Sequence, residues 1–578
     1  MNRGGDSTWG DSSDPSTIRI GGFATQVTRN LDAALRAIQK FMTAKRGITE
    51  IRLWVDAICI NQSDVQERSQ QVQNMRQIYV KATEVIAWVG TAEKEYECKK
   101  TAARLAATRA LDRSTNPGLI SGSDMATVYE FFSQDYWKRV WIIQEITVPD
   151  KVTILFGNYD FPWDHVAELV SVVKKIGTSR ETAVLRSTPE HLLEFRRFSA
   201  EHKPIDLFEA LIWSRRCRAT NLRDKIFALL GLCHDWRDFV PVPNYNQSLG
   251  SILADMNKAM MNRDKSLDIM CLKATSVCSG HSVGVPTWST DWPRLWIGGT
   301  TLLEDRLLVS QSTGSFNPIL PGSTDTVLNV RGRVLGSITG LTSAIQPFEK
   351  FFSPPKNPDS WILETENLSA TDPSLGKAGS YMIRFRDLLW ETLTMSLLFT
   401  PVTHAHTQMW TSFRWLWRPE GRGLITDLDL LEWVDRNAWF QVGSYTLREW
   451  SQMTEAKAPK SHSLKMPNIL SSATPKTEHS DQLDKQAMVS FINTLGKVLR
   501  SGMKLACLDN GAIAMVHYET KRDDRIYRLE GCSVPVILRR KGTARKNKHR
   551  FTVIGAAYVD ESQKFESSEE RAEELSLF

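Results

Sequence analysis

The chain has 578 residues, 42% hydrophobic and 24% charged, which is ordinary for a globular protein but too long for a single core. Its 72 basic and 66 acidic residues leave a net charge of +6, which requires no nucleic-acid partner. The polar start is unlike a signal peptide, the best apolar stretch is too short to cross a bilayer, and the 8 cysteines lack zinc spacing. We therefore expect a cytoplasmic protein without a membrane span or a metal centre.

The first elements along the chain are predicted to be a hairpin and a helix. Residues 18–27 read as two short strands around a pair of glycines. Thr28 or Asn30 can then cap a helix over residues 31–40.

Residues 53–90 predict a strand, a helix and a second strand. Residues 53–55 are apolar and end at Asp56, where a polar turn begins. Ser63 and the glutamine three residues later have capping-box spacing, so a helix should start there. Residues 83–90 read as a second buried strand that a glycine stops. Two nearly continuous apolar strands around a helix favour a parallel sheet covered on both faces.

Polar residues follow the first of these strands. In parallel sheets ligands gather beyond the carboxyl ends of the strands, where Asp56, Asn61 and Gln62 would lie. These side chains can hydrogen-bond ribose or phosphate. They can equally satisfy the backbone groups of the turn, as Asp and Asn commonly do.

Residues 137–145 predict a helix on which Trp137, Trp141 and Glu145 follow one another at intervals of four. A carboxylate beside two indoles is partly desolvated, which raises its pKa and suits acid–base chemistry or ribose binding. The alternative is a structural glutamate that pairs with an arginine or caps a neighbouring element.

Three further patterns are weaker indications of a functional site. Arg223 and Asp224 precede an apolar helix and predict an ion pair at its N-terminus. Residues 280–284 fit the nucleophile elbow of hydrolases, but Pro286 stands where a helix must follow. The basic run at 539–550 has no interleaved aromatic residues, so it predicts a solvated hairpin loop rather than a nucleic-acid site.

Shifts in periodicity and composition predict six regions. We expect an α/β core at 1–175, a helical continuation at 176–300, a mixed α/β region at 301–450, a linker or mobile loop at 451–486, a small antiparallel β module at 487–560, and an acidic, frayed tail at 561–578.

Several of these segments resemble motifs of the fungal heterokaryon-incompatibility (HET) domain, in the same order. The similar segments are residues 53–90, 136–146, 219–232, 285–292, 531–539 and 555–559. The resemblance implies a role in fungal non-self recognition, in which the domain triggers the death of incompatible fused cells. It also implies that the protein self-associates or binds another incompatibility protein.

HET domains have been proposed as distant relatives of TIR domains, and residues 137–145 look like the TIR segment in which a tryptophan precedes a glutamate by four. This resemblance implies a TIR-like parallel sheet with flanking helices, NAD as a substrate, and Glu145 as the catalytic residue. The residues placed around the substrate are then Trp9, Asp11, Asp56, Asn61 and Trp141. The alternative is a non-catalytic module that signals by assembly alone.

In the family, a strand precedes a turn that residues 7–11 resemble, and the chain has no such strand before them. We therefore expect either a late start codon or a sheet that lacks its first strand.

Overall fold

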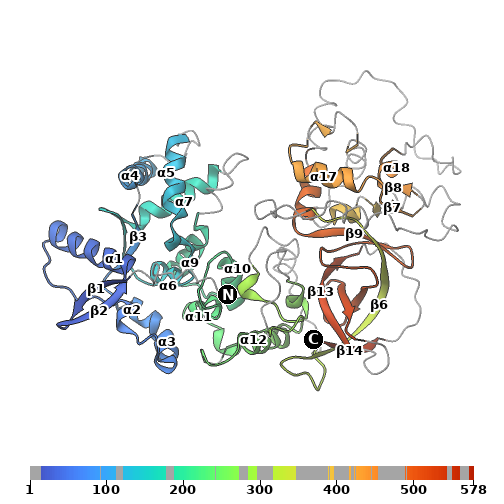
Figure 1. Cartoon of the computed structure of the whole chain (residues 1–578), viewed down its shortest axis with the longest axis horizontal. Coiled ribbons are helices and arrows are strands. Elements are labelled where there is room, and N and C mark those ends of the chain that lie inside the picture. Colours follow the sequence, from blue (N-terminus) through green and yellow to red (C-terminus); the bar gives the residue numbers. More distant parts are fainter. Residues whose placement is uncertain are drawn as a thin grey trace. The chain divides into compact units, whose positions relative to one another are not determined.

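The structure is a computed structural model, and it divides into two compact units, Met1–Ile252 and Leu253–Phe578 (Figure 1). It describes residues 15–91, 93–111, 122–176, 188–240, 242–272, 284–295, 317–345, 388–389, 391–395, 416–417, 422–423, 425–443, 445–452, 489, 491–542, 550–559 and 572–578. Trp9, Asp11 and all but the first two residues of the predicted linker at 451–486 lie outside these ranges. The six predicted region boundaries stay predictions.

A β-hairpin opens the described part of the first unit and confirms the sequence prediction. Strand β1 (Pro15–Ile20) pairs antiparallel with β2 (Phe23–Thr28). Gly21 and Gly22 join them with φ angles of 56° and 87°. Both angles lie in the left-handed region, which a two-residue hairpin turn of this kind requires and which glycine adopts without strain.

Helix α1 (Arg29–Lys40) follows the hairpin directly. Thr28 is its cap, because its side-chain oxygen accepts a hydrogen bond from the N–H of Leu31 at 3.3 Å. A short π-helical turn, η1 (Phe41–Lys45), continues the element. The predicted cap and helix are both confirmed.

The sheet of the first unit has three strands among the described residues. Strand β3 (Val85–Gly90) pairs in parallel with β4 (Val152–Phe156), as the apolar runs predict. Strand β5 (Tyr159–Pro162) pairs antiparallel with β4. Only a two-residue turn separates β4 from β5, and its Gly157 has a φ of 56°, so a hairpin forms where a parallel crossover has no room.

The predicted strand at residues 53–55 is not formed. Val55 is extended, with φ −136° and ψ 119°, but Asp56 already begins the short helix α2 (Asp56–Cys59). A strand needs a ladder partner, and none pairs with these residues in the described part of the chain. Leu53 is 41% exposed, so the segment is not buried as the prediction required.

The predicted helix at residues 137–145 is broken in two. A 3-10 turn, η3 (Asp135–Lys138), precedes α6 (Ile142–Thr147), and the chain between them is extended at Arg139. The N–H of Val140 donates to the carbonyl of Arg218 at 2.9 Å, forming a bridge to a distant segment. This long-range pairing replaces the local helical bonds, so the three predicted site residues do not share one helix stripe.

Helix α3 (Val65–Lys81) is capped one residue later than predicted. Asp64, rather than Ser63, accepts hydrogen bonds from the N–H groups of Gln66 and Glu67. Helices also form between residues 188 and 272, within the expected helical continuation. Along the chain the helices are α4 (Glu95–Leu111), α5 (Gly122–Ser133), α7 (Trp163–Ile176), α9 (Glu190–Ala200), α10 (Leu207–Trp213), α11 (Asp224–Leu230) and α12 (Leu249–Asp264), with 3-10 turns η4 (Trp236–Asp238), η5 (Asp268–Cys271) and η6 (Trp292–Arg294).

The second unit is built around a closed antiparallel sheet. Each strand in the ring pairs with the next, and the last pairs with the first, so among the described residues the ring has no free edge. Small and branched apolar residues such as Ala506, Ala514 and Ile537 fill its interior. In ring order the strands are β9 (Met503–Leu508), β6 (Leu328–Leu341), β11 (Arg525–Leu529), β12 (Val536–Arg540), β13 (Arg550–Tyr558) and β10 (Ile513–His517).

The end of the chain is ordered into this sheet, which overturns the predicted frayed tail over its last residues. Strand β14 (Glu573–Leu577) runs parallel to β13 and antiparallel to β6. Leu575 and Leu577 are buried, with exposures of 1% and 0%. The alternation of apolar and polar residues in this segment therefore outweighs its acidic composition.

A separate apolar cluster covers the outer side of β9 and β10. Leu505 and Met515 contribute from these strands, and Trp433 and Trp450 contribute from two helices. The elements packed here are α17 (Leu428–Arg436), β7 (Gln441–Val442), β8 (Tyr445–Thr446) and α18 (Leu447–Gln452).

Candidate functional site

Glu145 lies in the first turn of α6, where a tyrosine and an arginine reach its carboxylate. The hydroxyl of Tyr136 donates to Oε2 of Glu145 at 3.0 Å. Nη1 of Arg139 lies 4.0 Å from Oε1, and the two side chains are only 10% and 15% exposed. The break in the predicted helix creates this contact, because the extended residue at 139 brings the guanidinium beside the carboxylate.

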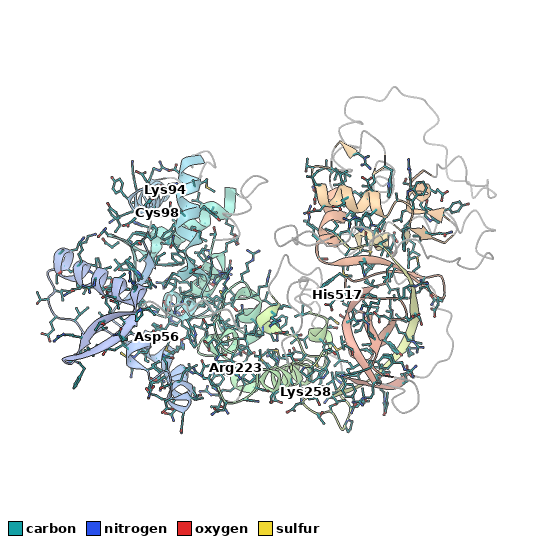
Figure 2. The ribbon with its side chains drawn as sticks, in the orientation of Figure 1. Asp56, Lys94, Cys98, Arg223, Lys258 and His517 are labelled. Carbon is teal, nitrogen blue, oxygen red and sulfur yellow. The ribbon has the colours of Figure 1, made fainter. Side chains whose placement is uncertain are left out.

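Asp56 belongs to the same electrostatic group. Burial raises its pKa to about 6, Arg139 opposes that rise, and the negative charge of Glu145 adds to it. The N–H of Ala57 donates to Asp56 at 2.8 Å and fixes the carboxylate at the start of α2. In Figure 2 Asp56 lies beside the β1–β2 hairpin.

Two tyrosine hydroxyls complete this group. Burial raises the pKa of Tyr79 well above its ordinary value, and the charges of Glu145 and Asp56 raise it further. Burial has the same effect on the pKa of Tyr136, with a smaller contribution from Glu145. We refer to Asp56, Tyr79, Tyr136, Arg139 and Glu145 as the Glu145 cluster. It contains two carboxylates and one guanidinium in a mostly buried place, an arrangement typical of functional sites.

The two indoles predicted to flank Glu145 face other partners. Trp137 is 2% exposed and packs edge-on against Phe131 and Phe132, with ring centroids 5.1 and 5.7 Å apart. Trp141 packs against the apolar cluster of Ile60, Met75 and Tyr79, and its indole N–H donates to Asp224. The desolvation around Glu145 therefore comes from the fold as a whole rather than from a tryptophan stripe.

Asn61 serves the turn between α2 and α3. Its side-chain oxygen accepts from the N–H and the hydroxyl of Ser63 at 3.2 and 2.6 Å. Its own N–H donates to Glu67 at 3.0 Å. These contacts correspond to the turn-stabilising alternative, and a role in ligand binding stays a prediction.

A groove of about 490 Å³ lies next to α2, within the size range of small-ligand sites. Val55, Ile58 and Cys59 form one wall and flank Asp56 in the sequence, whereas Glu145 does not line the groove. The other lining residues come from the hairpin, α1 and the segment before α2: Thr17, Ile18, Arg19, Ile20, Asp32, Leu35, Arg36, Gln39 and Leu53.

Comparison with known proteins identifies the segment that holds this site. Residues 7–145 match the family model described as heterokaryon incompatibility protein (HET). This segment is therefore similar to the HET domain. Asp56, Arg139 and Glu145 all lie within the matched residues, and Glu145 is the last of them.

The chain is also similar to a protein of Neurospora crassa described as heterokaryon incompatibility protein 6, OR allele. The two are 23% identical over 406 residues, which cover 58% of this chain and 59% of that relative. The chain therefore matches about three fifths of the relative's length. No solved structure matches the chain, so the TIR-like fold stays a prediction. Among the described residues, no helix is both long and apolar enough to cross a membrane.

A second polar cluster joins two residues of the matched segment to two residues beyond it. Asp224 at the start of α11 accepts a hydrogen bond from the hydroxyl of Tyr245 at 2.6 Å and another from the indole of Trp141. The guanidinium of Arg68 lies 4.1 Å from the ring centre of Tyr245 and lowers the pKa of Asp224, which burial raises. We call these four residues the Asp224 cluster.

Arg223 and Asp224 each hydrogen-bond to other residues instead of forming the expected ion pair with each other. Nε of Arg223 instead donates to the carbonyl of Gln247 at 2.8 Å. Asp224 turns toward the matched segment, where Trp141 directly precedes α6 and Arg68 belongs to α3. The motif thus joins three segments rather than stabilising one helix end.

Lys225 is a structural residue that the sequence analysis did not single out. Its ammonium group donates to the carbonyls of Ser214 and Arg215 at 3.3 and 2.9 Å and also to that of Cys217. Burial lowers its pKa to about 8. The sequence signal for this role is a lysine at the start of an otherwise apolar run, residues 225–230, which is buried in the structure. A buried lysine requires several hydrogen-bond acceptors around its ammonium group.

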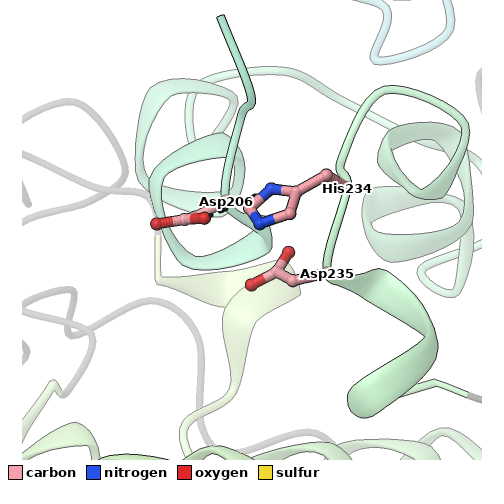
Figure 3. Close-up of side chains that lie close together, drawn as sticks. All are labelled: Asp206, His234 and Asp235. Carbon is pink, nitrogen blue, oxygen red and sulfur yellow. Dashed lines mark ion pairs between the residues drawn. The ribbon is translucent and has the colours of Figure 1, made fainter.

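One group of described residues has side chains close enough to share a metal ion. The ligand atoms of Asp206, His234 and Asp235 all lie within 4.8 Å of one another (Figure 3). His234 already pairs with Asp206 at 3.4 Å, and Asp235 accepts from the N–H of Leu207 at 2.8 Å. These contacts hold the loop before α10 against the loop after α11.

Proposed function

We propose that this protein acts in fungal non-self recognition and that its HET domain triggers cell death by hydrolysing NAD at the Glu145 cluster. The family match and the printed name of the Neurospora relative support the biological role. The chemical role rests on one observation, the pair of carboxylates that share a single guanidinium in a mostly buried place. We further propose that the protein acts in the cytoplasm.

For this reaction the protein mainly has to place a negative charge beside the ribose of NAD. The bond between C1′ of ribose and N1 of nicotinamide breaks, nicotinamide leaves with the electron pair, and positive charge develops on the ribose. Water then adds at C1′ and loses a proton, which gives ADP-ribose. A carboxylate at the position of Glu145 stabilises that positive charge and accepts hydrogen bonds from ribose hydroxyls, as in glycoside hydrolysis.

Tyr136 and Arg139 orient the Glu145 carboxylate, and Asp56 is suited to receive the proton from water. A base works best when its pKa lies near the working pH, and the Asp56 pKa of about 6 is close to it. Residues that neighbour Asp56 in the sequence line the groove beside α2, and we propose that this groove holds the rest of the nucleotide.

The test compares the full-length wild-type protein with Glu145→Gln, which keeps an acceptor for Tyr136 but removes the charge. NAD loss and ADP-ribose formation are followed by chromatography, and viability is followed in fungal cells that express each variant. Asp135→Asn is the matched control, because that carboxylate is 86% exposed in the same segment. We expect the wild type and the control to consume NAD and to kill, and Glu145→Gln to do neither. Cell death with NAD untouched would refute the enzymatic mechanism.

A non-catalytic signalling module is the second candidate, and exposed apolar residues favour it. Phe23 at the hairpin tip is 78% exposed, and Ile20 and Leu53 on the groove are 38% and 41% exposed. Such residues suit contact with a second copy or with another incompatibility protein. In that case Phe23→Ser abolishes self-association and killing, whereas Glu145→Gln leaves both intact.

A further inference from the structure

Two cysteines far apart in the sequence meet in the second unit. The sulfur atoms of Cys271 and Cys532 lie 3.6 Å apart, although 261 positions separate the residues. A disulfide bond is about 2.05 Å long, so the two sulfurs have to approach each other by about 1.5 Å to form one. Neither residue belongs to the Glu145 cluster or to the matched HET segment.

Hydrogen bonds from backbone N–H groups, one on each side of Cys532, hold the two thiols close to each other. The N–H of Leu267 donates to the carbonyl of Gly531 at 2.7 Å. The N–H of Ser533 donates to the Asp268 carboxylate at 2.6 Å. The contacts flank Cys532 immediately before and after, so the turn following β11 is fastened to η5 at the position where the sulfurs meet.

The two cysteines differ in exposure, and we assign them different roles. Cys271 is 2% exposed and Cys532 is half-buried, so Cys532 is assigned as the residue that a small oxidant meets first. The hydrogen bond with Cys271, burial and the charge of Asp268 all raise the pKa of the Cys532 thiol. Cys532 is therefore a thiol at neutral pH, and its oxidation should become faster as the pH rises.

We propose that Cys271 and Cys532 form a reversible oxidation site that joins η5 to the closed sheet by a disulfide. With hydrogen peroxide as the oxidant, the Cys532 thiolate attacks one peroxide oxygen. The O–O bond breaks, and after protonation water leaves and a sulfenic acid remains. The Cys271 sulfur then attacks the Cys532 sulfur, the S–O bond breaks, and a second water leaves. Two thiols and one peroxide thus give one disulfide and two waters.

The consequence is a closed loop of chain between residues 271 and 532, which contains β6, β9, β10 and β11. A cross-link over so long a loop restricts the unfolded chain strongly, and the flanking hydrogen bonds keep the native geometry close to that of the bond. The oxidised protein should therefore melt at a higher temperature than the reduced protein.

The experiment treats the full-length protein with graded hydrogen peroxide at pH 8, blocks free thiols with N-ethylmaleimide, and maps cross-linked peptides by mass spectrometry. Exposed Cys59 serves as an internal reference for oxidant strength. We expect a 271–532 cross-link that dithiothreitol reverses, together with a rise in melting temperature of at least about 4 °C. Cys532→Ser should remove both effects.

Two control variants test whether the cross-link is specific to Cys271 and Cys532. Cys507→Ser removes a buried thiol whose neighbour is the carbonyl of Gln441, and Cys278→Ser removes the other thiol near Cys271 in the sequence. Both variants should keep the cross-link and the shift in melting temperature. The proposal is overturned if Cys271 and Cys532 stay open to alkylation after denaturation at peroxide levels that oxidise Cys59, or if either pairs with another cysteine instead.

Discussion

The Glu145 cluster and the Asp224 cluster are both built on a mostly buried acid, and they differ in how its charge is matched. Asp224 receives neutral donors from Tyr245 and Trp141 and the field of Arg68. The Glu145 cluster holds a second carboxylate, Asp56, and shares one guanidinium between the two. Asp224 accepts hydrogen bonds from two other segments and so anchors them. In the Glu145 cluster two carboxylates face one guanidinium, and the rest of the fold has to stabilise the excess negative charge. Under the proposed function, that surplus suits the Glu145 cluster to chemistry.

The largest effect that separates the two clusters is expected for Glu145→Gln. NAD hydrolysis should fall at least about 100-fold, because the transition-state charge loses its partner. The melting temperature should change little, since the amide keeps the hydrogen bond from Tyr136. NAD turnover and calorimetry on the same sample check this. An equal loss in Asp135→Asn would assign the effect to the local fold rather than to the carboxylate.

Asp224→Ala should show the opposite pattern. The change leaves the Tyr245 hydroxyl and the Trp141 indole without their acceptor, and we expect a local stability loss of about 3 kcal/mol. Amide hydrogen exchange in α11 should therefore become faster by about 100-fold. NAD turnover per folded molecule should be retained. Asp238→Ala, an exposed acid in the same unit, should change exchange only slightly.

Asp56→Asn should alter how stability depends on pH. The folded pKa of about 6 lies above the ordinary value of 3.8, so the native state binds more protons than the unfolded state between those values. Stability is therefore lost as the pH rises from about 4 to about 6, by up to about 3 kcal/mol. The asparagine variant cannot ionise and should lack this loss. Melting curves of both proteins from pH 4 to 7.5 measure it, and parallel curves would contradict the assignment.

The smallest effect is expected for Tyr136→Phe. It removes one hydrogen bond to Glu145 and keeps the aromatic packing, so we expect a stability loss of about 1.5 kcal/mol and a fall in NAD turnover of about tenfold. A double-mutant cycle with Glu145→Gln measures the coupling directly. Strict additivity would show that the hydroxyl does not position the carboxylate.

The elements that the sequence predicted well are those decided within a few residues. The paired glycines at 21 and 22, the Thr28 cap and the apolar runs of β3 and β4 are local signals, and the structure follows them. Within the candidate site, the sequence singled out Asp56 and Glu145. It also offered pairing with an arginine as the alternative for Glu145, which Arg139 confirms, but it did not indicate Tyr79 or Tyr136.

The tertiary structure decided what depends on contacts between distant residues. The bridge from Arg139 to Arg218 breaks the expected helix and turns a guanidinium toward Glu145. The pairing of β14 with β6 orders a tail whose composition favours fraying. The sequence by itself determined where helices and strands can begin, because caps, turns and apolar periodicity act over a few residues. Which charges meet, and which strands close a sheet, depend on packing across hundreds of residues, and local patterns do not carry that information.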